Sequence, residues 1–115
     1  MTYDPNTVSA IEKVNSQASV TGAYTVPDVG TATLHRLILT GNVTLTYPAA
    51  VTGKSFTLVL VQDGIGGRTV TWPTAVDWSG GTAPTLSSGA GKVDVISMIY
   101  DGVNWLGFVA GQDMR

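Results

Sequence analysis

The sequence of 115 residues contains no cysteine and a single histidine. Without cysteine the chain cannot form disulfides, use a thiolate nucleophile or bind metal through sulfur, and its redox compartment cannot be inferred. One histidine alone cannot build a zinc site of the usual ligand set. We therefore expect no metal centre and no cofactor.

Charged residues are scarce, at 12% of the sequence, against about a quarter in typical soluble domains. The net charge is −2, and the six basic residues are spread along the chain. Nucleic acid is not an expected partner, because phosphate binding needs several Lys or Arg on one face. A surface with so few charges also predicts that part of it is buried against a partner.

Long apolar runs are missing as well. No run approaches the roughly 18 apolar residues of a membrane helix. The N-terminus lacks the basic and apolar regions of a signal peptide. We expect a single domain that is made in the cytoplasm and does not enter a membrane.

Residues 1–17 differ from the rest, and we expect an N-terminal arm or short helix there, ahead of a domain at residues 18–115. Asp4-Pro5 suits the start of a helix. Apolar residues then follow at helical spacing, at Val8, Ile11 and Val14. So short a helix is marginal alone and would need a docking surface. A frayed terminus is the alternative.

From residue 18 onward, short alternating runs and turn residues predict an all-β chain, an antiparallel β-sandwich or jelly-roll-like domain of seven to eight short strands. Gly41-Asn42 and Asp101-Gly102 predict tight hairpin turns. The expected strands are residues 18–26, 32–40, 43–47, 55–62, 68–72, 92–101 and 103–110, with a weaker one near 85–87.

Several of these strands are apolar on both faces, whereas a sandwich with one wet face should alternate apolar and polar residues. We therefore expect a second copy of the chain to cover the surplus face in a homo-oligomer. A monomer whose own loops cover that face is the alternative. The candidate residues of the subunit interface are Leu37, Leu39, Val59, Val61, Met98 and Tyr100.

No group of residues has the spacing of a catalytic site. Asp63 and Asp101 precede glycine, where aspartate usually stabilises a turn. The Gly-rich residues 63–67 lack the Lys-Ser/Thr of a phosphate loop. His35 lies in an apolar strand and no nucleophile elbow is present, so we expect it at a sheet surface or subunit contact. The sequence predicts no catalytic residues and no enzymatic activity.

The three tryptophans are the other candidates for a site. Trp72 and Trp105 occupy strand positions, which favours the core. Trp78 lies in a loop and is the candidate for contact with something outside the assembly. A sugar-binding platform is an alternative, formed by Trp72, Trp78, Trp105, Tyr47 and Tyr100.

Four segments, taken in their order along the chain, form a recognisable pattern. They are GRTVTWP at residues 67–73, GGTAPTL at 80–86, AGKVDV at 90–95 and YDGVNW at 100–105. This succession resembles a β-sandwich module that recurs in virion proteins of tailed bacteriophages, in both head decoration proteins and tail fibre proteins. The resemblance covers residues 34–112 and implies a trimeric, jelly-roll-like domain without enzymatic activity.

The small size of the chain, with the module almost alone behind a short segment that starts at Met1, favours a capsid decoration (cement) protein. Such a homotrimer would be made in the host cytoplasm and bind the major capsid protein on the outer surface of the head, gaining stability by avidity. The capsid-anchoring residues would be Tyr3, Val8, Ile11 and Val14. A tail-associated receptor- or carbohydrate-binding module that uses Trp78 is the alternative.

Overall fold

The computed structural model describes residues 13–28 and 30–115, and in this part of the chain it is all-β, as predicted. The only helical element among these described residues is a short 3-10 turn, Ser79–Gly81. The seven strands are β1 Val14–Thr25, β2 Leu34–Thr46, β3 Ser55–Gln62, β4 Val70–Thr71, β5 Val76–Trp78, β6 Val93–Tyr100 and β7 Trp105–Gly111. None of the helical segments described has the length and apolar character of a membrane span.

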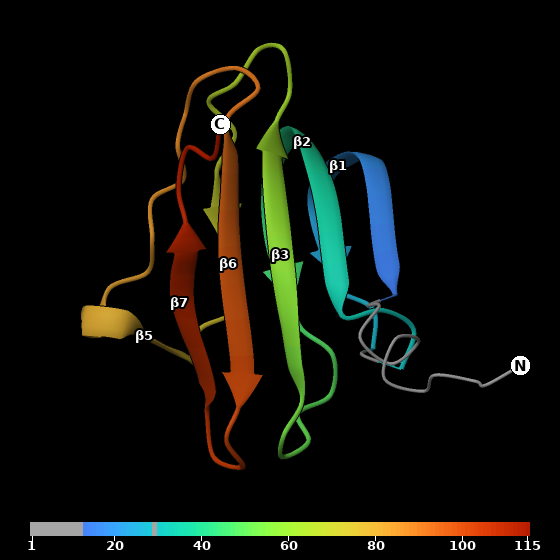
Figure 1. The fold of residues 1–115 in the computed structure, drawn as a ribbon, viewed down its shortest axis with the longest axis vertical. Helices are drawn as coiled ribbons and strands as arrows, with labels where there is room; N and C mark the ends of the chain where they lie inside the picture. Colours follow the sequence, from blue (N-terminus) through green and yellow to red (C-terminus); the bar gives the residue numbers. More distant parts are fainter. Residues whose placement is uncertain (1–12, 29) are drawn as a thin grey trace, which may run out of the picture.

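The strands form one folded sheet in the order β1-β2-β3-β6-β7-β5, with β4 paired to β2 off this path. The sheet is mixed, which corrects the expectation of antiparallel pairing throughout. β3, β6 and β7 pair antiparallel, whereas β1, β2 and β3 run parallel to one another. Figure 1 shows β3, β6 and β7 side by side in a front layer, with β4 and the end of β2 behind them.

Two parallel strands that are neighbours in a sheet need a long crossover connection between them. Between β2 and β3, the second half of β2 itself forms part of that connection. β2 pairs with β3 only through its first half, over Leu34 to Leu39. Its second half, Val43–Thr46, pairs with the end of β1 and with β4. The strand therefore passes from the front layer to the back layer, and residues 47–54 return the chain to the start of β3.

The hairpin predicted at Gly41-Asn42 is wrong, because β2 continues through these residues as one strand. β1 turns the same corner beside it, and a Cβ on Gly41 would collide with Thr21 of β1. Glycine is what lets the two backbones approach here. Asn42 accepts a hydrogen bond from the Thr69 backbone N–H at 3.1 Å, which ties the corner to the segment before β4.

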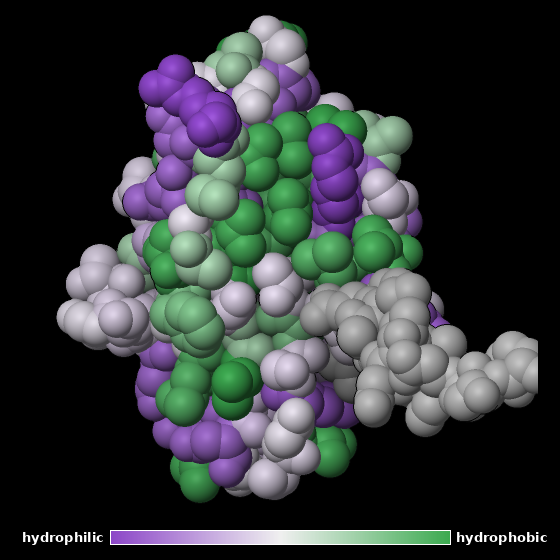
Figure 2. All heavy atoms as spheres, viewed as in Figure 1, coloured by the Kyte–Doolittle hydropathy of each residue, from purple (hydrophilic) through white to green (hydrophobic). Residues whose placement is uncertain are grey.

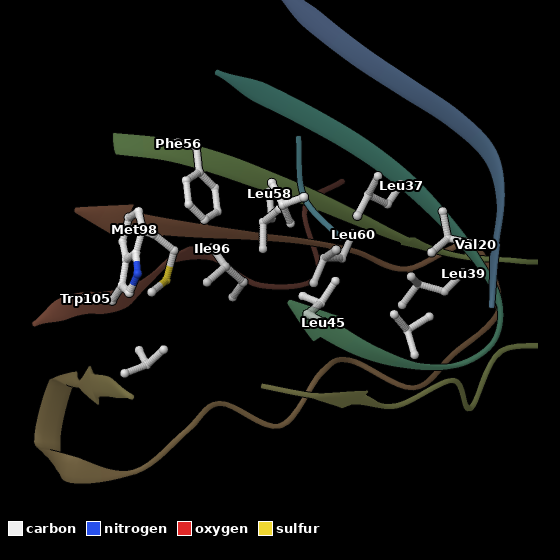
Figure 3. Close-up of a cluster of buried hydrophobic side chains, with 13 residues drawn as sticks. Val20, Leu37, Leu39, Leu45, Phe56, Leu58, Leu60, Ile96, Met98 and Trp105 are labelled. Carbon is white, nitrogen blue, oxygen red and sulfur yellow. The ribbon is translucent and has the colours of Figure 1, made fainter. Parts of the chain in front are cut away.

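The hydrophobic core lies between the front and back layers (Figure 3). Leu58 and Ile96 of the front layer are fully buried, and Leu45 of β2 belongs to the same buried cluster. Trp105 is 6% exposed and its ring lies 5.3 Å from those of Phe56 and Tyr100, centroid to centroid. The core position predicted for Trp105 is confirmed.

Three of the predicted interface residues belong to this core instead. Leu37, Leu39 and Met98 are at most 1% exposed within the single chain, so their side chains are not available to another subunit. Tyr100 is half-buried, and its hydroxyl donates to the Val103 carbonyl at 3.2 Å. Because both faces of these strands are apolar in sequence, only the position of the back layer decides which face is internal.

The outer face of the front layer carries several exposed apolar residues. Ile99, Leu106 and Phe108 are 44%, 37% and 43% exposed. Val59 lies on the same face, half-buried beside Val95 of β6. Figure 2 shows hydrophobic residues over β3, β6 and β7 on this face. A shallow hollow of about 200 Å³ opens next to Ile99 and Phe108.

Candidate functional site

Two loops at one end of the sandwich are held together by buried polar side chains. The first loop, residues 63–69, joins β3 to β4, and the second, residues 82–92, leads into β6. The Gln62 side-chain amide donates to the carbonyls of Arg68 and Ser87, at 2.8 and 3.1 Å, and its oxygen accepts the Arg68 backbone N–H at 3.0 Å. Gln62 is 3% exposed, so these bonds form away from water and fix the spacing of the loops.

Asp94 fixes the second loop from the other side. Its carboxylate accepts the backbone N–H of Ser87 at 2.6 Å and that of Asp113 at 2.9 Å. The group is 2% exposed and uses both oxygens. The loop is therefore tied both to β6 and to the residues after β7.

Asp63 stabilises the first loop, as predicted for an aspartate before glycine. Its Oδ1 accepts the backbone N–H groups of Ile65 and Gly66, and its Oδ2 lies 2.9 Å from Arg68 Nη2. The hydrogen bond from Arg68, followed by that from Gly66, lowers the pKa of Asp63 to about 2. The pair therefore remains ionised throughout the ordinary pH range.

A cavity of about 280 Å³ lies between the two loops. Val70, Pro84 and Leu86 supply apolar walls, while Thr69, Thr85 and Ser88 supply hydroxyl groups. Arg68 also lines the cavity, but its charge is paired with Asp63. The cavity is thus electroneutral, amphipathic and bounded by backbone that internal hydrogen bonds hold in place.

Sequence reasoning missed this site because it searched for titratable and aromatic groups. The available signal was polar residues at inward positions of apolar strands. Gln62 closes the run FTLVLVQ, and Asp94 interrupts the run KVDVIS. Buried polar side chains of this kind are usually hydrogen-bonded and mark a fixed piece of structure.

Trp78, the candidate for external contact, is half-buried and packs on the core. Its ring lies 4.9 Å from that of Trp72, centroid to centroid. It also covers Gly107 so closely that a Cβ there would lie 2.6 Å from the ring. Only part of Trp78 is available to a partner, and neither it nor Trp72 lines the cavity between the two loops.

His35 is completely buried, which corrects the surface position expected from the sequence. Its Nδ1 lies 3.1 Å from the Asn15 amide of β1, its ring meets Phe56 edge-on, and its Nε2 has no hydrogen-bond partner among the residues that the structure describes. Burial lowers the pKa of His35, because the cation would lose its hydration. His35 is therefore a neutral core residue that joins β2 to β1.

This burial predicts a pH-dependent stability. Below a pH of about 6.5 the unfolded chain binds a proton at His35, whereas the folded chain does not. The free energy of unfolding should therefore fall as the pH drops. The fall should end once the pH is below the lowered pKa of His35 in the folded state. Each unit of lowering corresponds to about 1.4 kcal/mol. Urea denaturation of the wild type and of His35→Gln, between neutral pH and pH 5, measures the difference. An equal loss in both proteins would contradict the prediction.

Among residues 13–28 and 30–115, no three His, Cys, Asp or Glu side chains form a group that could hold a metal ion. The predicted anchoring residues Tyr3, Val8 and Ile11 lie outside the described residues. Val14 is the first residue of β1 and is 55% exposed. The last residues of the segment assigned to an arm or helix therefore belong to a strand.

The family of the chain follows from its sequence comparison. A family profile described as "Putative phage tail fibre C-terminal domain" matches residues 24–105. The chain belongs to this family. The match runs from the end of β1 to the first residue of β7, so it includes both loops and all the residues that line the cavity. Comparisons with curated proteins and with solved structures found no match.

As a phage tail fibre C-terminal domain, the chain is a structural module of the virion, and the predicted resemblance to phage virion proteins is confirmed at this level. The family name refers to the tail, not to the head. It therefore favours the tail-associated alternative over the capsid decoration protein that the length of the chain suggested.

Proposed function

We propose that this protein is a tail-associated module of the phage virion that contacts the surface of the host cell. The family match over residues 24–105 is the observation that carries the proposal, because it spans β2 to β6 and both loops, and not one motif. The structure supports it through the two loops at one end of the frame, which are rigid and partly exposed. Rigid loops on a stable scaffold are the usual place for binding functions.

We also propose that the module binds without catalysing a reaction. The titratable groups around the cavity are occupied in structural bonds: Asp63 with Arg68, and Asp94 with two backbone N–H groups. A general acid or base needs a carboxyl or imidazole within reach of the substrate. His35 is enclosed in the core and does not line the cavity.

Two experiments test the tail assignment. Antibodies against the protein, labelled with gold, should mark the tail of intact virions in electron micrographs. The purified protein should compete with virions for host cells and slow their adsorption. Labelling distributed over the head, with no effect on adsorption, would reject the proposal and restore the decoration protein.

Copies of the chain are proposed to assemble, as a homotrimer, through the outer face of the front layer. The exposed apolar side chains Ile99, Leu106 and Phe108 are adjacent on β6 and β7, and isolated monomers seldom expose apolar patches of this kind. β1 adds an edge of 12 residues without charge or proline. Edge strands of monomers usually carry charged residues or proline, which prevent pairing with another chain.

The assembly predicts a mass of three chains in native mass spectrometry. Phe108→Asp should shift the protein toward the mass of one chain, because it buries an unpaired charge in the interface. Val103→Asp is the matched control: Val103 is 75% exposed in the turn between β6 and β7, outside the face, and the trimer should persist. A wild type that remains monomeric at every concentration would exclude the assembly.

A further inference from the structure

We propose that the cavity between residues 67–70 and 84–88 is the receptor site and that it binds one neutral sugar unit of a surface glycan. This inference rests on the proposed function, because it names the ligand of a module that contacts the cell surface. None of the tryptophans considered as contact residues in the sequence analysis lines this cavity.

The size of the cavity limits the ligand to a small ring. About 280 Å³ lies just below the roughly 300–1,000 Å³ typical of small-molecule sites. A single sugar ring is of this order, whereas an extended peptide or a lipid chain would leave most of its length outside. A glycan can continue into solvent, because the cavity opens at the surface between the loops.

The chemistry of the walls matches an uncharged, amphipathic ring. Three hydroxyl-bearing residues, Thr69, Thr85 and Ser88, share the cavity with Val70, Pro84 and Leu86. A sugar ring has the same division between hydroxyl groups and apolar C–H faces. Polar groups placed in a largely apolar cavity orient a ligand and give specificity.

The charge balance of the site excludes ionic ligands as the preferred class. An anion would need a free cation, but Arg68 is held by Asp63 through both Nε and Nη2, at 3.3 and 2.9 Å. A cation would need a free carboxylate, and both oxygens of Asp94 already accept backbone N–H groups. A neutral ligand leaves these pairs intact.

The walls are also fixed before any ligand arrives. Gln62 bridges the two loops, the Gly67 N–H donates to the Ser88 carbonyl at 2.7 Å, and the Gln112 amide donates to the Thr85 carbonyl at 2.8 Å. Loops that are already ordered lose little conformational freedom on binding, which raises affinity for a small ligand.

Titration of the ¹⁵N-labelled protein with single sugars, followed by two-dimensional NMR, tests the inference. Glucose, galactose, rhamnose and N-acetylglucosamine represent neutral sugars, glucuronic and N-acetylneuraminic acids anionic ones, and glucosamine cationic ones. We expect at least one neutral sugar to shift the amide signals of residues 67–70 and 84–88 with millimolar affinity.

Two variants of the same loop provide the control. Thr85→Trp should fill the cavity and weaken binding by at least about tenfold, which corresponds to about 1.4 kcal/mol. Thr82→Trp adds the same ring at an exposed residue that does not line the cavity and should bind like the wild type. Thr85→Val, which keeps the shape but loses the hydroxyl, should weaken binding to a smaller extent.

The inference is overturned if no neutral sugar shifts these signals up to its solubility limit, if charged sugars bind better, or if Thr85→Trp and Thr82→Trp bind alike. Its failure can be distinguished from failure of the proposed function. Virions labelled on the tail with no sugar response would reject the cavity alone. Sugar binding with virions labelled on the head would reject the tail assignment alone.

Discussion

Replacing Trp105 with alanine should cost about 3–5 kcal/mol of folding free energy, the range for removing a large aromatic side chain from a core. Trp105 is the centre of an aromatic cluster. Its ring centroid lies 5.5 Å from that of Tyr47 and 5.3 Å from those of Phe56 and Tyr100, and each pair meets edge to face. Such pairs add about 0.5–1.5 kcal/mol beyond the area that they bury.

The cluster also joins the two layers, which makes local collapse around the missing ring difficult. Trp105 starts β7 and Phe56 lies on β3, both in the front layer, whereas Tyr47 follows the end of β2 in the back layer. A small domain has only about 5–15 kcal/mol of stability in total. The substitution should therefore remove a large fraction of it.

Urea denaturation of Trp105→Ala measures this loss of stability. Trp78→Ala is the control, because it removes the same indole ring from another position. Trp78 is only half-buried, on the edge strand β5, so we expect a loss of about 1–2 kcal/mol, roughly half the value for a fully buried side chain. If the two variants lose the same stability, the aromatic cluster does not join the layers as described.

Gly66→Ala should destabilise the protein by about 2–5 kcal/mol, through two effects at the same residue. Gly66 has φ of 76°, a left-handed conformation that costs other residues about 1–2 kcal/mol. A Cβ there would lie 2.5 Å from the Ser88 carbonyl oxygen and 2.8 Å from the Ala90 nitrogen. Both are backbone atoms that cannot rotate away, and such overpacking costs about 1–3 kcal/mol.

The collision would also separate the loops that enclose the cavity. Ser88 accepts the Gly67 N–H, so displacement of the Ser88 carbonyl should break this hydrogen bond between the two loops. Thermal or urea denaturation gives the stability, and loss of the sugar-dependent NMR shifts at residues 67–70 gives the effect on the site.

Gly64→Ala is the control in the same loop. Gly64 has no positive φ, and a Cβ there would meet nothing within 4 Å. Its stability should remain within about 0.5 kcal/mol of the wild type, as for ordinary surface substitutions. A loss of stability at Gly64 equal to that at Gly66 would show that the loop tolerates no side chain anywhere and that the contact with Ser88 is not the cause.

The local pattern was sufficient to place β3, β6 and β7. The expected strand at residues 55–62 coincides with β3, and the expected strands at 92–101 and 103–110 differ from β6 and β7 by at most two residues at either end. The Asp101-Gly102 hairpin is confirmed, with Asp101 accepting the backbone N–H groups of Val103 and Asn104 at 2.8 Å. For these strands and this turn, the hydrophobic periodicity and the turn residues both predict the structure that forms.

The Gly41-Asn42 turn shows where local chemistry is ambiguous. Glycine followed by asparagine suits both a hairpin and a corner inside one strand. The corner forms because β1 runs parallel to β2 on both sides of it, and Leu39 and Val43 remain on the same inward face. A partner that lies outside the local segment decided the outcome.

The amino-acid sequence by itself determined the all-β class, the strand periods, the Asp101-Gly102 turn and the kinship with phage virion proteins, because these depend on residue types at short spacing. The tertiary structure alone decided which of two apolar faces became the core, and it buried His35, Leu37 and Met98. It also brought Gln62 and Asp94 to the loops around the cavity. Burial and loop contacts depend on residues far apart in the chain, and neither composition nor spacing records them.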